Sequence, residues 1–287
     1  MSSINSKSKD IKNKTKKNVT SKMSAINAIR NKIDNIDLSI HDLIMKRALY
    51  VQDIAKEKSI ISQNKAIIYR PAREHKILMA LIKRHKGDFP LEVLIKIWRT
   101  LIGAYISIQG DFKISYFYSF ENLVKDYFGI TMTYNGIKNI KKSLDNLSSN
   151  IIDLLVLPLP NNQIDWWLSL LNYKNIFVIG RLSDSLLGKE KALILGSQEV
   201  EYTNTNKVLY IVFIKKDDVN LLKKFFLKNK YLILAKSKIN SKKYAFLFST
   251  IVNSREEALS NLSLLKNKDF VESKNIRIAG VVPNIEK

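Results

Sequence analysis

The chain has 287 residues, enough for two domains or one large one, and 46% of them are hydrophobic, so it can build ordinary cores. It contains no cysteine, which excludes disulfides, thiolate nucleophiles and thiolate metal sites. The net charge of +22 is typical of nucleic-acid-binding proteins, but the lysine excess is scattered and no recognised binding motif accompanies it.

The sequence also bears on location. No apolar run reaches the roughly 18 residues that a membrane span needs. The N-terminus lacks the apolar core of a secretory signal. We therefore expect a cytoplasmic protein without a membrane partner.

The first 60 residues predict a tail and a long helix. Residues 1–22 are mostly Ser, Asn, Thr and Lys, too polar to bury much surface, which predicts a disordered basic tail. From Met23 onward, apolar residues recur at steps of three and four, the pattern of a packed helix: Ile26, Ile29, Ile33, Ile36, Ile40 and Leu43. A helix over about 23–60 would be on the order of 55 Å long, more than one small domain can cover. This length favours an intertwined dimer.

Two shorter helices come next. The first has Pro71 near its start, where the missing N–H costs nothing, and stops near Gly87. The second begins around Pro90 and ends at Gln109-Gly110, where the glycine suits a left-handed cap. Residues 23–110 are therefore expected to form an all-α, three-helix domain.

Beyond Gly110 the periodicity changes, and the chain is expected to be multidomain. An α/β region is predicted over 111–204, with strands near 112–118, 151–157, 176–179 and 192–195 and helices near 120–128 and 136–148. Residues 205–287 predict a βαββαβ, ferredoxin-like domain. Its elements are strand 208–215, helix 217–229, strands 231–238 and 243–252, helix 254–267 and strand 276–282.

Arginine is concentrated in the helical part, where six of the nine arginines lie between residues 30 and 99. Such clustering indicates bidentate anion recognition, although exposed salt bridges also cluster on helices. Arg47, Val51, Ile54 and Lys58 are spaced four, three and four, so they share one helix face. Cations on an otherwise apolar face are costly unless an anion meets them, and a ligand could supply that anion. The three histidines lack the spacing of a metal-binding pair, so no metal site is expected.

Five separated segments, in order, resemble the all-helical (AroQ-type) chorismate mutases, and most closely the mutase domains fused ahead of prephenate dehydratase. The resemblance covers about residues 23–110. The segments are Ile29-Arg30-Asn31-Lys32-Ile33-Asp34-Asn35-Ile36-Asp37, Leu43-Ile44-Met45-Lys46-Arg47, Ile54-Ala55-Lys56-Glu57-Lys58, Tyr69-Arg70-Pro71-Ala72-Arg73-Glu74 and Ile97-Trp98-Arg99 followed by Gln109-Gly110.

The resemblance implies a binding site for chorismate, the substrate, in a homodimer. Arg30 would reach into the partner subunit's site. It lies seventeen residues before Arg47, roughly 25 Å away along one helix, too far to share a site with Arg47 in the same subunit. Arg47 and Arg73 would hold the substrate carboxylates. Arg70, also expected at the site, stands where some family members have an acidic residue.

The resemblance also implies the catalytic groups. Lys58 would face a carboxylate and the ether oxygen, Glu74 would hold the ring hydroxyl, and Gln109 would donate to the ether oxygen. Tyr105 stands at a position that is often a small residue. The rearrangement of chorismate to prephenate is unimolecular, so fixed donors and orientation suffice, and no cofactor or metal is expected.

The remaining chain resembles a shortened prephenate dehydratase lobe followed by an ACT-like regulatory domain. The lobe lacks the family's Gly-Pro-x-Gly-Thr and Thr-Arg-Phe motifs, so we expect no dehydratase activity. Residues 215–218 lack the Pro-Gly of the effector loop, which leaves an aromatic amino-acid effector open. The sequence thus favours a chorismate mutase, an isomerase of phenylalanine and tyrosine biosynthesis. A bifunctional mutase–dehydratase and a non-catalytic nucleic-acid-binding protein remain the alternatives.

Overall fold

The computed structural model describes residues 3–61, 67–183, 188–272 and 276–284, and the chain divides into two units, 1–63 and 64–287. The first unit is one helix, and the second combines helices with a sheet. No helix in the described ranges has the length and apolarity to cross a lipid bilayer.

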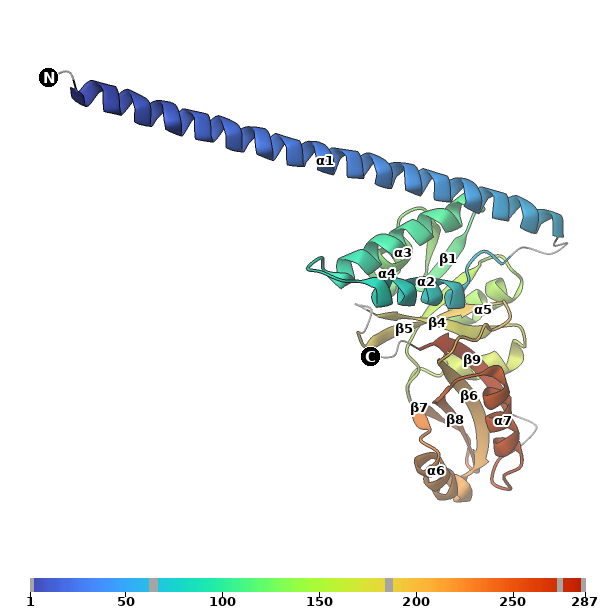
Figure 1. Cartoon of the computed structure of the whole chain (residues 1–287). Coiled ribbons are helices and arrows are strands. Elements are labelled where there is room, and N and C mark those ends of the chain that lie inside the picture. The colour runs from blue at the N-terminus through green and yellow to red at the C-terminus, as the bar shows by residue number, and fades with distance from the viewer. Residues whose placement is uncertain (1–2, 62–66, 184–187, 273–275, 285–287) are drawn as a thin grey trace. The chain divides into compact units, whose positions relative to one another are not determined.

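The first unit is α1 (Ser3–Ile61), a single continuous helix (Figure 1). The predicted helix of 23–60 is confirmed. The helix begins at Ser3, and the disorder expected of residues 1–22 stays a prediction. The first 61 residues contain neither Gly nor Pro, so no residue interrupts the helix, and lysine is a good helix former. An apolar stripe is exposed along α1 and consists of Met23, Ile26, Ile29, Ile33, Ile36, Ile40 and Leu43.

The second unit opens with two helices, α2 (Pro71–Arg84) and α3 (Leu91–Ile108), as the sequence predicted. Leu78 and Ile95 are buried between them and are surrounded by half-buried apolar side chains. Gln109 closes α3, and Gly110 comes next with a positive φ of 154°. The same unit contains the α/β region, so the domain boundary predicted at residue 110 does not separate these two helices from the strands after residue 110.

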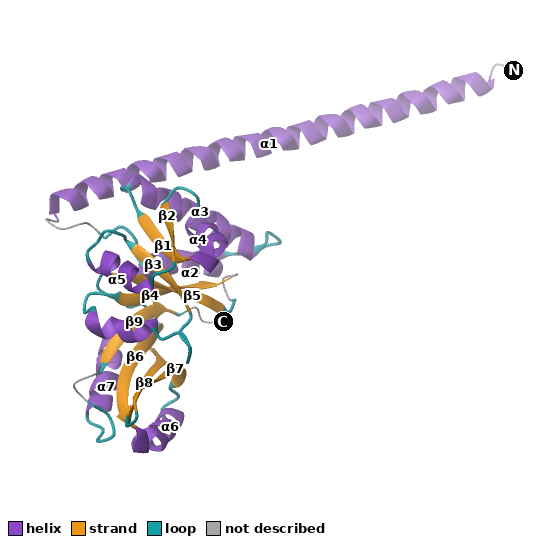
Figure 2. Cartoon of the chain, turned by 180° about the vertical axis from the view of Figure 1, so that it is seen from behind, coloured by secondary structure: helices purple, strands orange, loops and turns teal. Residues whose placement is uncertain are grey.

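The rest of the unit is built on one nine-stranded sheet with the order β2-β1-β3-β5-β4-β9-β6-β8-β7 (Figure 2). The strands are β1 (Lys113–Phe117), β2 (Thr133–Ile137), β3 (Leu154–Pro158), β4 (Phe177–Ser183), β5 (Glu190–Gly196), β6 (Asn206–Lys215), β7 (Leu232–Asn240), β8 (Lys243–Val252) and β9 (Arg277–Pro283). The helices are α4 (Glu121–Phe128), α5 (Ile140–Ser148), α6 (Val219–Lys228) and α7 (Arg255–Lys266), with short 3-10 segments η1 (Tyr118–Phe120), η2 (Trp166–Asn172) and η3 (Lys216–Asp218).

The C-terminal strands adopt the predicted βαββαβ order. They lie as β9-β6-β8-β7 and all pair antiparallel, which is the ferredoxin-like arrangement. The boundary predicted between residues 204 and 205 does not break the sheet. Instead β4 pairs in parallel with β9 at Val178 and Gly280, where a Cβ on the glycine would lie 2.5 Å from the Cβ of Val178. The backbones approach so closely that only glycine fits.

Both faces of this part of the sheet are buried at β6, β8 and β9. Leu222 and Phe226 of α6 and Leu265 of α7 pack against one face. Trp166 and Trp167 of η2 belong to the core on the other face, and Trp167 is fully buried. Alternate residues of β6 enter the two cores, as the two-residue period of a strand requires. One sheet therefore joins the predicted second and third domains.

The α/β region departs from prediction at β2. Residues 136–148 were predicted to be helical, but α5 starts at Ile140, and Thr133–Ile137 pairs in parallel with β1. β2 is an edge strand with mostly exposed side chains, so it carries little apolar pattern.

Candidate functional site

The helix α2 has an exposed cationic face and a buried face. Arg73, Lys76 and Lys83 succeed each other at steps of three and seven, so they lie on one face, and Arg73 is exposed. Glu74 is one residue further and turned by roughly 100°, which puts it on the buried face with Leu78. Glu74 is therefore separated from the cationic face of its own helix.

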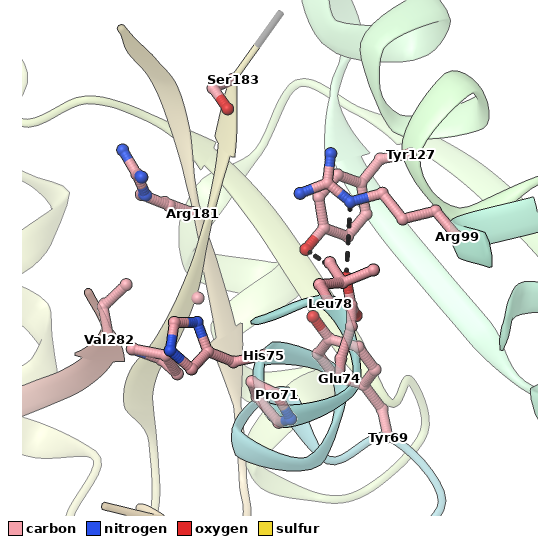
Figure 3. Close-up of a pocket in the computed structure, with 12 residues that line it drawn as sticks. Tyr69, Pro71, Glu74, His75, Leu78, Arg99, Tyr127, Arg181, Ser183 and Val282 are labelled. Carbon is pink, nitrogen blue, oxygen red and sulfur yellow. Dashed lines mark hydrogen bonds and ion pairs between the residues drawn. The ribbon is translucent and has the colours of Figure 1, made fainter. Parts of the chain in front are cut away.

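Glu74 lies in a buried polar cluster, shown in Figure 3, and only 7% of its surface is exposed. The hydroxyl of Tyr127 donates a hydrogen bond to its Oε1 at 2.9 Å. The Nε of Arg99 lies 3.6 Å from the same oxygen, an ion pair rather than a hydrogen bond. The Arg99 guanidinium carbon also lies 4.4 Å from the centroid of the Tyr127 ring. The three side chains thus contact one another pairwise.

Burial sets the electrostatics of this cluster. Desolvation raises the pKa of Glu74 above its ordinary value of 4.5, whereas the charge of Arg99 and the hydrogen bond from Tyr127 oppose that rise. Desolvation also raises the pKa of Tyr127 and of the buried Tyr69, so both hydroxyls keep their protons. The cluster therefore offers fixed donors around one carboxyl group.

A cavity of about 50 Å³ adjoins the cluster, enough for a water or a small polar group. His75 and Arg181 border it on the side away from Tyr127 (Figure 3). Desolvation, followed by the charge of Arg181, lowers the pKa of His75, so this imidazole is neutral at pH 7. Arg181 itself lies 3.8 Å from Glu190.

The cationic face of α2 lines a larger, open groove of about 1040 Å³. Its opposite wall is the polar segment 201–205. Arg70 donates a hydrogen bond of 2.6 Å to Glu201 across the groove. Arg70 and Arg73 line the same groove, so two of the predicted substrate-binding residues lie together. The pairing with Glu201 explains how an arginine is accommodated at position 70.

The other predicted residues lie elsewhere. Arg30, Arg47 and Lys58 belong to α1, where Arg47 and Lys58 are eleven residues apart and share one face. Gln109 borders neither the cavity nor the groove, and its Nε2 donates to the backbone oxygen of Tyr105 at 3.1 Å. Within unit 64–287, the predicted residues therefore fall into three places.

The sequence missed the roles of Arg99 and Tyr127. Arg99 stands inside a segment that carried the family resemblance, but spacing gave no reason to pair it with Glu74. Tyr127 lies 53 residues after Glu74 on α4, and no local pattern predicts that contact. Within the described residues, no three His, Asp or Glu side chains group as metal ligands would.

Comparison with known proteins finds similarity in the first part of the chain. Residues 29–110 match the model of the family "Chorismate mutase type II". The bifunctional chorismate mutase/prephenate dehydratase of Stutzerimonas stutzeri is 28% identical over 98 residues, which is 33% of this chain and 27% of that protein. The protein of the same name from Aquifex aeolicus is 27% identical over 147 residues, 48% of this chain and 40% of that protein. The matches thus span about a quarter to two fifths of these relatives.

Solved structures align with part of the chain at low identity. Prephenate dehydratase from Streptococcus mutans aligns with a TM-score of 0.43 at 15% identity, covering 60% of this chain and 97% of that one. A structure described as GqqA, a novel type of quorum quenching acylase, aligns with a TM-score of 0.44 at 12% identity, covering 60% and 95%. The family match covers the segment in which the sequence motifs lie, so residues 29–110 are similar to chorismate mutase type II domains.

Proposed function

We propose that the protein is a chorismate mutase that converts chorismate to prephenate. The observation that carries the proposal is the family match over 29–110, because all seven predicted site residues lie inside it. Chorismate is a dianion, and its rearrangement breaks an ether bond as a new carbon–carbon bond forms within one molecule. Such a reaction needs orientation and fixed positive donors, which arginine and lysine provide without a cofactor.

Each residue has a proposed role. Arg47 and Arg73 hold the two carboxylates, and the arginine fork suits such groups. Lys58 and Gln109 stabilise the negative charge that grows on the ether oxygen, and Glu74 accepts the ring hydroxyl. The rotation of the Gln109 side chain away from the backbone oxygen of Tyr105 would free its amide for this purpose.

The test is the loss of chorismate absorbance with the purified full-length chain. We expect a rate well above the uncatalysed one, and Arg47→Ala is expected to lower kcat/KM by about 10²-fold or more. Lys46→Ala is the matched control, because it removes a cation one residue away on another side of α1. Wild-type protein with no rate above background would refute the proposal.

We also propose that the active unit is a homodimer in which Arg30 reaches the partner's site. The exposed apolar stripe of α1 supports this, since a second copy of the helix would bury it. Mixing inactive Arg30→Ala with inactive Arg47→Ala is expected to restore about a quarter of the activity, because half of the dimers then carry one intact site of two. If Arg30 and Arg47 of the same subunit formed one site, the mixture would recover no activity.

The relatives' printed names include prephenate dehydratase, which favours that activity as a second candidate. We propose that this chain lacks it, because residues 111–204 lack the dehydratase motifs. Incubation with prephenate and detection of phenylpyruvate tests the point, and product formation would overturn it.

We place the enzyme in the cytoplasm with the biosynthesis it serves. Calorimetry with phenylalanine and tyrosine tests an effector role for 205–287.

A further inference from the structure

The α/β region contacts the mutase segment through Tyr127. This residue lies on α4, beyond the family match that ends at residue 110, yet it bonds to Glu74 inside that match. We propose that the α/β region supplies Tyr127 as a positioning residue for the mutase, where it and Arg99 orient the carboxylate of Glu74 toward the substrate's ring hydroxyl. The inference rests on the mutase function proposed above.

The contacts fix the carboxylate from two sides. The Tyr127 hydroxyl lies 2.9 Å from Oε1 of Glu74, and the Nε of Arg99 lies 3.6 Å from the same oxygen. The Arg99 guanidinium also contacts the Tyr127 ring, so moving either side chain breaks a contact of the other. Figure 3 shows the two contacts converging on Glu74 from α3 and α4. A carboxylate with one oxygen held in this way has a restricted direction in which to accept a further hydrogen bond.

The position of α4 is itself specified by close packing. A Cβ on Gly103 of α3 would lie 3.0 Å from the carbonyl carbon of Phe128 and closer still to its oxygen, so the two helices approach as only a glycine allows. The ring of Tyr69, which precedes α2, packs edge-on against Phe128 with centroids 5.5 Å apart. Lys96 of α3 bonds to Asp126 of α4. The position of Tyr127 is therefore set by several packing contacts between α3, α4 and Tyr69, and not by its hydrogen bond to Glu74 alone.

The charge state of Glu74 gives a readout that a purely structural role would not change. The groups that face it are Tyr69, Arg99 and Tyr127, and the same cavity is lined by His75 and Arg181. Arg99 and the hydroxyls of Tyr127 and Tyr69 all favour the ionised carboxyl, against desolvation. Loss of the Tyr127 hydroxyl removes one stabilising donor, so the pKa of Glu74 rises further. The ionised carboxylate of Glu74 is the proposed acceptor for the substrate's ring hydroxyl. The pH below which the enzyme loses this carboxylate must therefore rise as well.

The experiment compares kcat/KM against pH for wild type, Tyr127→Phe and Tyr134→Phe. Tyr127→Phe keeps the ring over Arg99 and removes only the donor. We expect the acid limb of its profile to move up by about one pH unit, with a several-fold loss of kcat/KM at neutral pH. Tyr134→Phe is the matched control, because Tyr134 is a partly buried tyrosine of the same region whose hydroxyl bonds to the backbone of Gly129. Its profile is expected to match the wild type.

A second variant covers the case in which Tyr127→Phe does not fold. Arg99→Gln removes the cation from the same oxygen and is expected to shift the acid limb in the same direction, whereas Arg99→Lys is expected to rescue part of the shift. An active wild type whose acid limb is unchanged in the folded variants would overturn the inference and leave the mutase function standing. A wild type without mutase activity would overturn the proposed function itself, and the positioning role with it.

Discussion

Gly103→Ala tests whether the mutase segment and the α/β region are packed as one body. The added methyl group would point into the carbonyl of Phe128, inside the distance that real Cβ atoms keep, so the backbone of α3 or α4 must move by about 1 Å. Overpacking of this kind costs about 1–3 kcal/mol, and a backbone neighbour that cannot rotate away puts the cost in the upper part of that range.

The same substitution has an opposite effect within the helix. Alanine in a helix interior is better than glycine by about 0.8–1.0 kcal/mol. The net expectation is a loss of about 1–2 kcal/mol, which lowers the melting temperature by roughly 3–6 °C in a unit of this size. If α3 did not pack against α4, only the gain of about 0.8–1.0 kcal/mol in helix propensity would remain.

Thermal and urea unfolding of the full chain measure this difference, with Thr100→Ala as the control. Thr100 is exposed one turn earlier on α3, so its replacement should give a small gain from helix propensity alone. Gly103→Ala at least as stable as the wild type would refute the packing of α3 against α4.

Three further predictions rest on particular contacts. Gly280→Ala would place a Cβ 2.8 Å from the Cα of Val178, so we expect a loss of about 2–3 kcal/mol in urea unfolding; an unchanged midpoint would show that β4 and β9 are not joined there. Arg277 donates from all three guanidinium nitrogens to four backbone carbonyls, so Arg277→Lys is expected to cost about 2–3 kcal/mol and Arg277→Met more; an unchanged urea midpoint for both variants would contradict the role of these bonds. Burial raises the pKa of Glu74 in the folded state, so the folded chain holds this proton more tightly and the wild type loses stability as pH rises from about 4.5 through that pKa. Glu74→Gln has no such loss, so the wild-type-minus-variant free energy of unfolding should fall over that window, and a flat difference would contradict the raised pKa.

Local sequence signals predicted the elements well. Pro71 and Pro90 mark where α2 and α3 begin, and the apolar repeat from Met23 predicted a long helix. The βαββαβ order was readable because β6, β8 and β9 have strong apolar cores, with both faces of the sheet covered there.

The misses have a common physical cause, which is contact between distant parts of the chain. The junction of β4 with β9 rests on the close approach at Gly280, about a hundred residues after Val178. Glu74 accepts a hydrogen bond from Tyr127, a contact that helix periodicity cannot foresee.

Product identification by proton NMR is the most direct measurement of what the protein does with chorismate. The full-length chain is incubated with chorismate, with Arg47→Ala beside it. We expect prephenate to accumulate at a rate far above the spontaneous one, to persist without conversion to phenylpyruvate, and to depend on Arg47. Chorismate that disappears no faster with the protein than without it would contradict the mutase function.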